Sequence, residues 1–322
     1  MCPGSAASSA AFAVRDFEQR GLCQISTRSI VPVPGLSVPV RTVYLVQGQL
    51  GFDSMPRKLI KVTPSRLGVW NDCRRRFRMT YVDRPTPPRG GPWAHSTLGA
   101  VVHNALKALF DLPVERRTPD SAAALVGTHW KDDGFADSAQ AGEFRERAAG
   151  WVHDYVKETD VSDDPVGLER WVSAPVGTIV AEGRVDRIDQ RGGELVIVDY
   201  KTGRHALTTD DARGSQALAL YVLAARRTLR RPCTRVELHH LPTGGVAVWE
   251  HTEDSLARHL SRAEEAADEF QLAIDTHKAG GDPEVLFPPN PGRQCSWCDF
   301  RRNCAEGQAA GPAIDPWAML SP

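Results

Sequence analysis

Two aspartates and a lysine in the stretch GRVDRIDQRGGELVIVDYKTG, residues 183–203, have the spacing of side chains that meet across a β-hairpin. The runs VAEGRVDRID and ELVIVDYK are rich in strand-forming residues, and RGGE between them supplies turn glycines, which predicts such a hairpin. If a four-residue loop, residues 191–194, closes it, counting outward in antiparallel register places Asp186 opposite Asp199. Lys201 lies two residues beyond Asp199, so strand periodicity puts both on one face.

A pair of opposed carboxylates needs a positive charge between them. Directly opposite residues have Cβ atoms roughly 5 Å apart, and like charges there are destabilising. A divalent cation, which prefers carboxylate oxygens, would neutralise the pair. Asp186, Asp199 and Lys201 converging on one spot suit metal-assisted attack of water on a phosphodiester. The alternative is a surface hairpin whose charges are simply solvated.

Asp186 and the later string VDYKTG, residues 198–203, resemble the motif of the PD-(D/E)XK nucleases, and the string is most similar to that of their RecB-like exonuclease branch. The resemblance extends from about Val62 to Gly307, with the motifs in family order. It implies a restriction-endonuclease-like α/β fold, in which a mixed β-sheet is flanked by helices. It also implies a nuclease whose products carry 5′-phosphates.

The same resemblance implies roles for individual residues. His103, Asp186, Asp199 and the Tyr200 carbonyl would bind Mg²⁺ or Mn²⁺, and His103 ends a GxxxH pattern in a predicted helix. Lys201 would orient or help deprotonate the attacking water and stabilise the developing phosphate charge. A lone histidine on a helix is otherwise a structural residue, which is the alternative for His103.

Three further residues are weaker candidates. Glu169 resembles the acidic residue that some family members carry ahead of the hairpin, although a charged residue before a strand is commonplace. The RecB-like branch has a Gln-x3-Tyr signature on the helix after the hairpin. Here Gln216 and Tyr221 are one position further apart, which on a helix separates them by about 140° rather than about 40°. Tyr221 is alternatively a core residue, and neither belongs to the expected catalytic set.

Three of the seven cysteines crowd near the C-terminus, as Cys295, Cys298 and Cys304. In an intracellular protein this pattern favours a metal or cluster site over disulfides. Together with Cys73, the Cys-x2-Cys-x5-Cys spacing resembles the four-iron staple of AddB-type and CRISPR-associated RecB-like nucleases. The resemblance implies a 4Fe-4S cluster that ties the N-terminal helices to the C-terminus. Zn²⁺ accepts the same four thiolates, so the spacing alone leaves the metal open.

Cys73 lies in a predicted helix that Thr63-Pro64-Ser65 begin and that continues to Val82. Arg74, Arg75 and Arg76 follow the cysteine directly. Guanidinium groups match phosphate oxygens, so these arginines are expected to contact DNA. The alternative is a solvated basic face.

The composition is that of an ordinary globular protein, with 322 residues, 41% hydrophobic, 25% charged and a formal net charge of -1. The overall charge will not attract DNA, so contacts with nucleic acid require local basic patches. There is no apolar run of about 18 residues and no basic segment followed by an apolar one at the N-terminus. We therefore expect no transmembrane helix, no secretory signal and a cytoplasmic location.

The remaining elements follow from periodicity and turn signals. Residues 113–168 are expected to be mainly helical, with Trp151 and Tyr155 in the core rather than as base-stacking platforms. A second hairpin should turn at residues 243–245. Helices are expected from Ser96 or Thr97 to about 112, over about 210–230 and over 253–279.

The predicted organisation has five parts. They are a disordered tail at 1–57, in which Met55 is a candidate start codon, a helical N-terminal part of the nuclease domain at 58–168, the nuclease core at 169–282, a cluster segment at 283–310 and a tail at 311–322.

The sequence thus predicts a metal-dependent DNA nuclease acting on single-stranded ends in recombinational repair. It contains no Gly-x4-Gly-Lys-Ser/Thr loop, so a helicase partner is expected to present the DNA. The alternatives are a non-catalytic DNA-end binding module, a CRISPR-adaptation nuclease and a scaffold whose only cofactor is the cluster.

Overall fold

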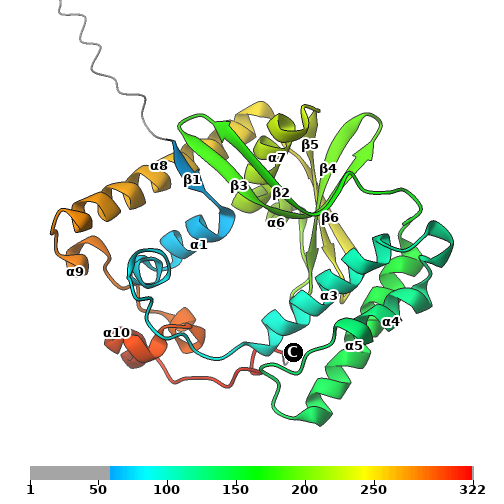
Figure 1. The fold of residues 1–322 in the computed structure, drawn as a ribbon, viewed down its shortest axis with the longest axis horizontal. Helices are drawn as coiled ribbons and strands as arrows, with labels where there is room; N and C mark the ends of the chain where they lie inside the picture. The colour runs from blue at the N-terminus through cyan, green and yellow to red at the C-terminus, as the bar shows by residue number, and fades with distance from the viewer. Residues whose placement is uncertain (1–58, 321–322) are drawn as a thin grey trace, which may run out of the picture. The chain divides into compact units, whose positions relative to one another are not determined.

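A mixed six-stranded β-sheet forms the centre of the molecule in the computed structural model, which describes residues 59–320 (Figure 1). The predicted tail at 1–57, with Met55, lies outside the described residues. The strand order is β1-β3-β4-β5-β6, with β2 also paired to β3; β1–β3 and β4–β5 are parallel and the other pairs antiparallel. The strands are β1 Ile60–Val62, β2 Gly167–Val176, β3 Ile179–Arg191, β4 Glu194–Lys201, β5 Cys233–His240 and β6 Gly245–Glu250.

Helices cover both faces of the sheet, so the α/β class with a mixed sheet flanked by helices is confirmed. The helices α3, α4 and α5 bury their apolar faces against Val196, Val198 and Tyr200, while α1, α7 and α8 pack against the other face. The α-helices are α1 Pro64–Asp72, α2 Arg74–Phe77, α3 Ala94–Phe110, α4 Pro119–His129, α5 Ser138–Glu158, α6 Thr209–Gly214, α7 Gln216–Leu229, α8 Glu253–Lys278, α9 Pro283–Leu286 and α10 Ala305–Ala309. Other helical turns span Arg78–Val82 (π), Val114–Arg116, Arg293–Trp297 and Arg301–Asn303 (3₁₀).

The central hairpin has the predicted register but a shorter turn. Gln190 pairs with Leu195, and Arg191 also pairs with Glu194. The loop is therefore only Gly192 and Gly193, with φ values of 57° and 91°, and not four residues. Two left-handed residues give the two-residue turn that matches strand twist, and glycine adopts them without steric cost.

Two predicted helices are broken in the structure. The first begins as expected, because Thr63 Oγ1 accepts a hydrogen bond from Arg66 N–H at 3.1 Å. It ends before Cys73, whose extended backbone (φ -161°, ψ 117°) separates α1 from α2. The helix predicted at about 210–230 likewise divides at Ser215, whose side chain caps α7. Capping side chains and extended residues thus interrupt runs that look continuous by periodicity.

The C-terminal segment packs on the start of α3. This helix begins at Ala94, two residues before the predicted cap at Ser96, and Ala94 N–H donates to Pro316 O at 3.1 Å. Leu320 is buried in the same hydrophobic cluster as α3. Figure 1 shows this segment running from α10 to the N-terminal end of α3. Residues 311–320, predicted only as a tail, therefore belong to the fold.

The second hairpin is confirmed, but its loop is residues 241–244 rather than the predicted 243–245, because Gly245 already pairs with His240 as the first residue of β6. Helix α8 spans the predicted long helix. Within residues 59–320, no helix combines the length and apolarity needed to cross a membrane.

Candidate metal centre

Three carboxylates lie at one level of the sheet, on three adjacent strands. The β3–β4 pairing ends one residue short of Asp186 and Asp199, which are the next opposed pair in the predicted register. On the other side of β3, the β2–β3 pairs bracket Glu169, which falls opposite Asp186. The flanking pairs are Arg187–Val198, Leu168–Arg187 and Arg170–Val185.

The backbone is irregular at this level. Glu169 has φ of 45°, a left-handed conformation that is uncommon for residues other than glycine and that clusters at functional sites. Across β3, the Asp186 side chain continues where the backbone ladder stops, because its Oδ2 accepts a hydrogen bond from Tyr200 N–H at 2.9 Å. This bond fixes the carboxylate of Asp186 against β4.

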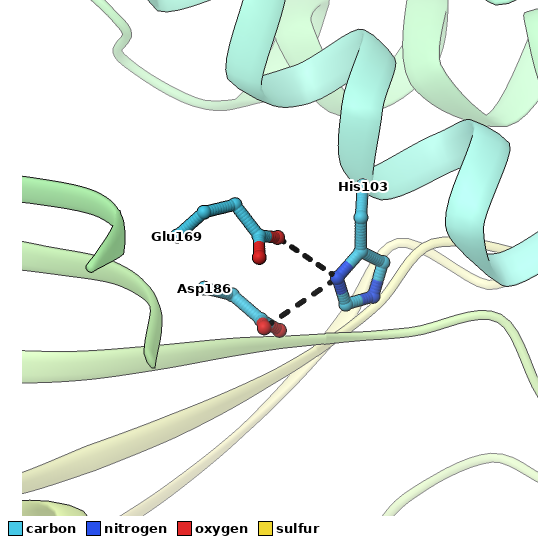
Figure 2. A group of neighbouring side chains, drawn as sticks. All are labelled: His103, Glu169 and Asp186. Carbon is cyan, nitrogen blue, oxygen red and sulfur yellow. Dashed lines mark ion pairs between the residues drawn. The ribbon is translucent and has the colours of Figure 1, made fainter. Parts of the chain in front are cut away.

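His103 on α3 points at two of the carboxylates (Figure 2). Its Nδ1 is 3.5 Å from Glu169 Oε1 and 3.5 Å from Asp186 Oδ1, and its Nε2 is 3.1 Å from Tyr200 O. One ligand atom from each of His103, Glu169 and Asp186 lies within 4.8 Å of the other two. Glu169, a weak candidate from sequence, therefore lies in the closest group, beside two of the expected ligands.

Gly99 allows α3 to approach the end of β4. A Cβ at this position would lie 3.4 Å from Thr202 Oγ1, directly after the strand. His103 is one helical turn further along α3 and reaches the carbonyl of Tyr200 from there. The glycine of the GxxxH pattern thus serves helix–strand contact, and the histidine serves the site.

The cluster attracts positive charge. Burial disfavours an imidazolium, but the hydrogen bonds to Asp186 and Glu169 and the charges of Asp186 and Asp199 outweigh it and raise the pKa of His103 to about 10. Both ring nitrogens face acceptors, as an imidazolium requires. The carboxylates that keep the proton on His103 are oxygen donors, and Mg²⁺ and Mn²⁺ prefer such donors.

Asp199 and Lys201 complete the site from β4. Asp199 is 9% exposed, and burial raises its pKa although Lys201 opposes the shift. Lys201 Nζ forms an ion pair with Asp199 Oδ2, while its side chain stays 46% exposed. The lysine can therefore reach a water molecule or a phosphate without first being uncovered.

The structure separates the two members of the altered Gln-x3-Tyr signature. Tyr221 packs on β3, where a Cβ on Gly183 would lie 2.6 Å from its ring. Burial and then the charges of Asp199 and Asp186 raise the pKa of Tyr221. Gln216 instead hydrogen-bonds to His259 on α8, at 2.7 and 3.0 Å. Only Tyr221 is brought near the carboxylates.

Arg184, which is not among the site residues predicted from the sequence, contacts the site. Its Nε is 2.7 Å from Glu169 Oε2, and its side chain is 67% exposed. Trp171 is its cross-strand partner and is 55% exposed. The signal was available, because Arg184 lies two residues before Asp186 on β3 and Trp171 two residues after Glu169 on β2.

The three arginines after Cys73 form ion pairs inside the fold. Arg75 is only 8% exposed and joins α2 to Glu306 on α10. A side chain buried in this way does not fit the expected contact with a phosphate. Arg74 and Arg76 are partly exposed, and for them the DNA contact stays a prediction. The pairs are Arg74–Glu269 at 2.7 Å, Arg75–Glu306 at 2.6 Å, Arg75–Glu284 and Arg76–Asp72 at 3.0 Å.

One cavity lies between the α1–α2 junction and residues 289–307. It is lined by all four expected cluster ligands, Cys73, Cys295, Cys298 and Cys304. Arg75, Arg76 and Arg301 line it as well, and Gly307 N–H donates to Cys304 Sγ at 3.3 Å. Four thiols with surrounding donors and cations fit an anionic four-thiolate group. The break at Cys73 places this residue on the cavity wall.

A model of the PD-(D/E)XK nuclease superfamily matches residues 61–305 of the chain. No curated protein sequence is significantly similar to it.

Proposed function

Because the chain belongs to the PD-(D/E)XK nuclease superfamily, we propose that it is a metal-dependent DNA nuclease that cuts single-stranded ends in DNA repair or recombination. Superfamily membership indicates hydrolysis of phosphodiester bonds with a divalent metal ion. The preference for ends, the RecB-like branch and the repair role are parts of the proposal.

The observation that carries the proposal is the alignment of Glu169, Asp186 and Asp199 across three strands, with His103 above them and Lys201 beside them. Carboxylates in such a row repel one another unless a cation lies between them. Such a row of carboxylates is therefore typical of a site that binds a metal ion for catalysis.

Glu169, Asp186 and His103 would hold Mg²⁺ or Mn²⁺, and the His103 ring would release its Nδ1 proton when the ion binds. Asp199 and the Tyr200 carbonyl are the further ligands that we propose. The ion, when bound, supplies a Lewis acid for the phosphate and lowers the pKa of water. The Tyr200 N–H holds Asp186 in orientation. Lys201 is exposed enough to orient the attacking water and to stabilise charge on the phosphate.

We also propose that the four cysteines hold a 4Fe-4S cluster that ties α2 to the C-terminal segment. The four cysteines line one cavity together with arginines, and a backbone N–H donates to Cys304 Sγ, which suits an anionic group held by four thiolates. A zinc ion, which accepts the same four ligands, is the alternative. A helicase partner would present the DNA strand.

The test is cleavage of end-labelled single-stranded DNA by protein purified without oxygen, with Mg²⁺ or Mn²⁺ and with a chelator. Lys201→Ala should lose about 100- to 1,000-fold in rate, as expected for loss of one group that stabilises the transition state. Lys278→Ala, an exposed lysine at the end of α8, is the matched control and should cleave normally. Equal cleavage by all three proteins would locate the activity elsewhere. Tight DNA binding without cleavage by the wild type would indicate a non-catalytic DNA-end binding module.

A further inference from the structure

A pocket of about 410 Å³ opens where β4 ends, outside the carboxylate cluster. One wall is the N-terminal part of α3 with His95 and Leu98, and another is α5 with Trp151. The floor is the loop at 202–205 that follows Lys201, and Leu320 of the C-terminal segment contributes to the rim. Pro242, which follows β5, lines it as well, so five separate parts of the chain build the pocket.

Two parts of the chain lead from the pocket to residues of the metal centre. Thr202 and Gly203 of the floor directly follow Lys201. On α3, Leu98 and His95 precede His103 by five and eight residues, which is about 7.5 and 12 Å along the helix axis. At about 3.4 Å per nucleotide in a stacked strand, this span corresponds to roughly two to four nucleotides.

The wall on α5 presents aromatic and basic groups together. Phe144, Arg147 and Trp151 are spaced by three and four residues, so they share one face of the helix. The guanidinium of Arg147 lies 4.9 Å from the centroid of the Phe144 ring and is also paired with Glu143 at 2.6 Å. Trp151, expected in the core, is only partly buried, and it packs on the core while also lining the pocket.

The charges of the pocket match a nucleic acid strand. Its lining includes the guanidinium groups of Arg147 and Arg204 and the imidazoles of His95 and His205, and no carboxylate. Burial lowers the pKa of His95, so the two arginines supply the positive charge. The metal centre, in contrast, is rich in carboxylates and needs a cation before a phosphate can approach. An apolar ligand would not require this basic rim, whereas a base with its phosphate requires both stacking and positive charge.

We propose that this pocket binds one nucleobase of the substrate strand, two to four nucleotides from the scissile phosphate, by stacking on Trp151. Arg147 on the α5 wall and Arg204 in the floor would contact the strand's phosphates. The inference rests on the proposed nuclease function, because that function places a phosphodiester at the carboxylates. It gives a physical reason for the proposed preference for single strands, since a base must leave its pairing partner to enter the pocket.

The test is an abasic scan, read as binding rather than as cleavage. Single-stranded oligonucleotides that each lack one base are titrated against protein carrying Lys201→Ala with Mg²⁺, so that the strand stays intact. In this background one position, two to four nucleotides from the cleavage site mapped with Lys201 present, should bind about 5- to 150-fold more weakly, the usual effect of one lost stacking contact. Adding Trp151→Ala should weaken binding of the full oligonucleotide by a similar factor and remove the sensitivity to that abasic site. Trp151→Phe keeps a ring and should restore most of the affinity.

Trp130→Ala is the matched control for packing. Trp130 is also partly buried and contacts the same hydrophobic cluster, but it does not line the pocket. The Trp130→Ala variant should lower the melting temperature as Trp151→Ala does, while the affinity for the oligonucleotide stays unchanged. The proposal is overturned if both tryptophan variants weaken binding equally, or if the abasic penalty persists with Trp151→Ala. A wild type that binds the strand without cutting it would refute the nuclease function and leave the pocket to be judged by the scan, whereas no binding at all would refute both.

Discussion

Replacing Glu237 with alanine should destabilise the protein by about 3 kcal/mol, because this residue is the buried anion of a network behind the metal centre. Glu237 on β5 is 3% exposed. His239, one of its partners, hydrogen-bonds to Tyr155 at 2.9 Å. Arg187 then donates to the hydroxyls of Tyr155 and Tyr200, both at 3.3 Å, which connects the network to β4. The bonds to Glu237 come from Arg191 at 2.7 and 3.1 Å, Arg235 at 2.8 Å and His239 at 2.9 Å.

The magnitude follows from what the deletion leaves behind. Removing one partner of a buried ion pair costs about 3–5 kcal/mol, since the remaining charge is uncompensated. Arg191 and Arg235 are 44% and 38% exposed, so they can turn to water and the lower end applies. For a domain of this size each kcal/mol lowers the melting temperature by about 2–4 °C, which gives a decrease of about 6–12 °C.

The same variant predicts a pH dependence. Burial alone would raise the pKa of Glu237, but the hydrogen bonds from His239, Arg191 and Arg235 hold it well below its ordinary value. A carboxyl with a depressed pKa in the folded state stabilises the protein above its unfolded pKa of about 4.3, and this stabilisation is lost as the pH falls. The difference in unfolding free energy between wild type and Glu237→Ala should therefore be full at pH 7 and narrow below about pH 4.3.

Urea unfolding at several pH values, with Glu250→Ala as control, checks both points. Glu250 pairs with the same Arg235 at 3.4 Å but is 67% exposed, so its loss should cost less than about 1 kcal/mol. A Glu237→Ala protein no less stable than Glu250→Ala, or a difference between wild type and Glu237→Ala that does not change with pH, would refute the reasoning.

Three other perturbations test separate parts of the molecule. Cys298→Ala should abolish the visible absorption of a cluster and lower stability strongly; an unchanged melting temperature would contradict the staple. Gly99→Val should keep the fold but slow metal-dependent cleavage by about 100-fold, because added carbons meet Thr202 and displace α3 by a fraction of an ångström to an ångström. Normal cleavage kinetics would show that the close approach of α3 is not needed. Burial, with the charge of His259, lowers the pKa of His251 to about 4, so the folded state keeps this ring neutral while the unfolded state takes up a proton. Stability should therefore fall between about pH 6.5 and pH 4, and His251→Gln should reduce that slope in calorimetry.

Much of the site could be predicted from local pattern. Strand periodicity and the turn glycines place Asp186 opposite Asp199 with Lys201 on the same face, and the structure has that register although the turn is two residues shorter. Capping and periodicity located most helices and the second hairpin. These features depend on residues near one another in the chain, which is why the sequence alone was sufficient.

Tertiary packing decided the rest. Glu169 in β2 has a left-handed backbone conformation, and nothing in the neighbouring sequence indicates that conformation. Whether it reaches the site therefore could not be predicted from the sequence. Arg75 joins α2 to α9 and α10 because Glu284 and Glu306, more than 200 positions away, neutralise its charge there. Gln216 turned to His259 and away from the carboxylates. A side chain's role is set by the partner that offers the best charge and hydrogen-bond match in space. The sequence determines which partners exist, and only the folded chain determines which of them lie within reach.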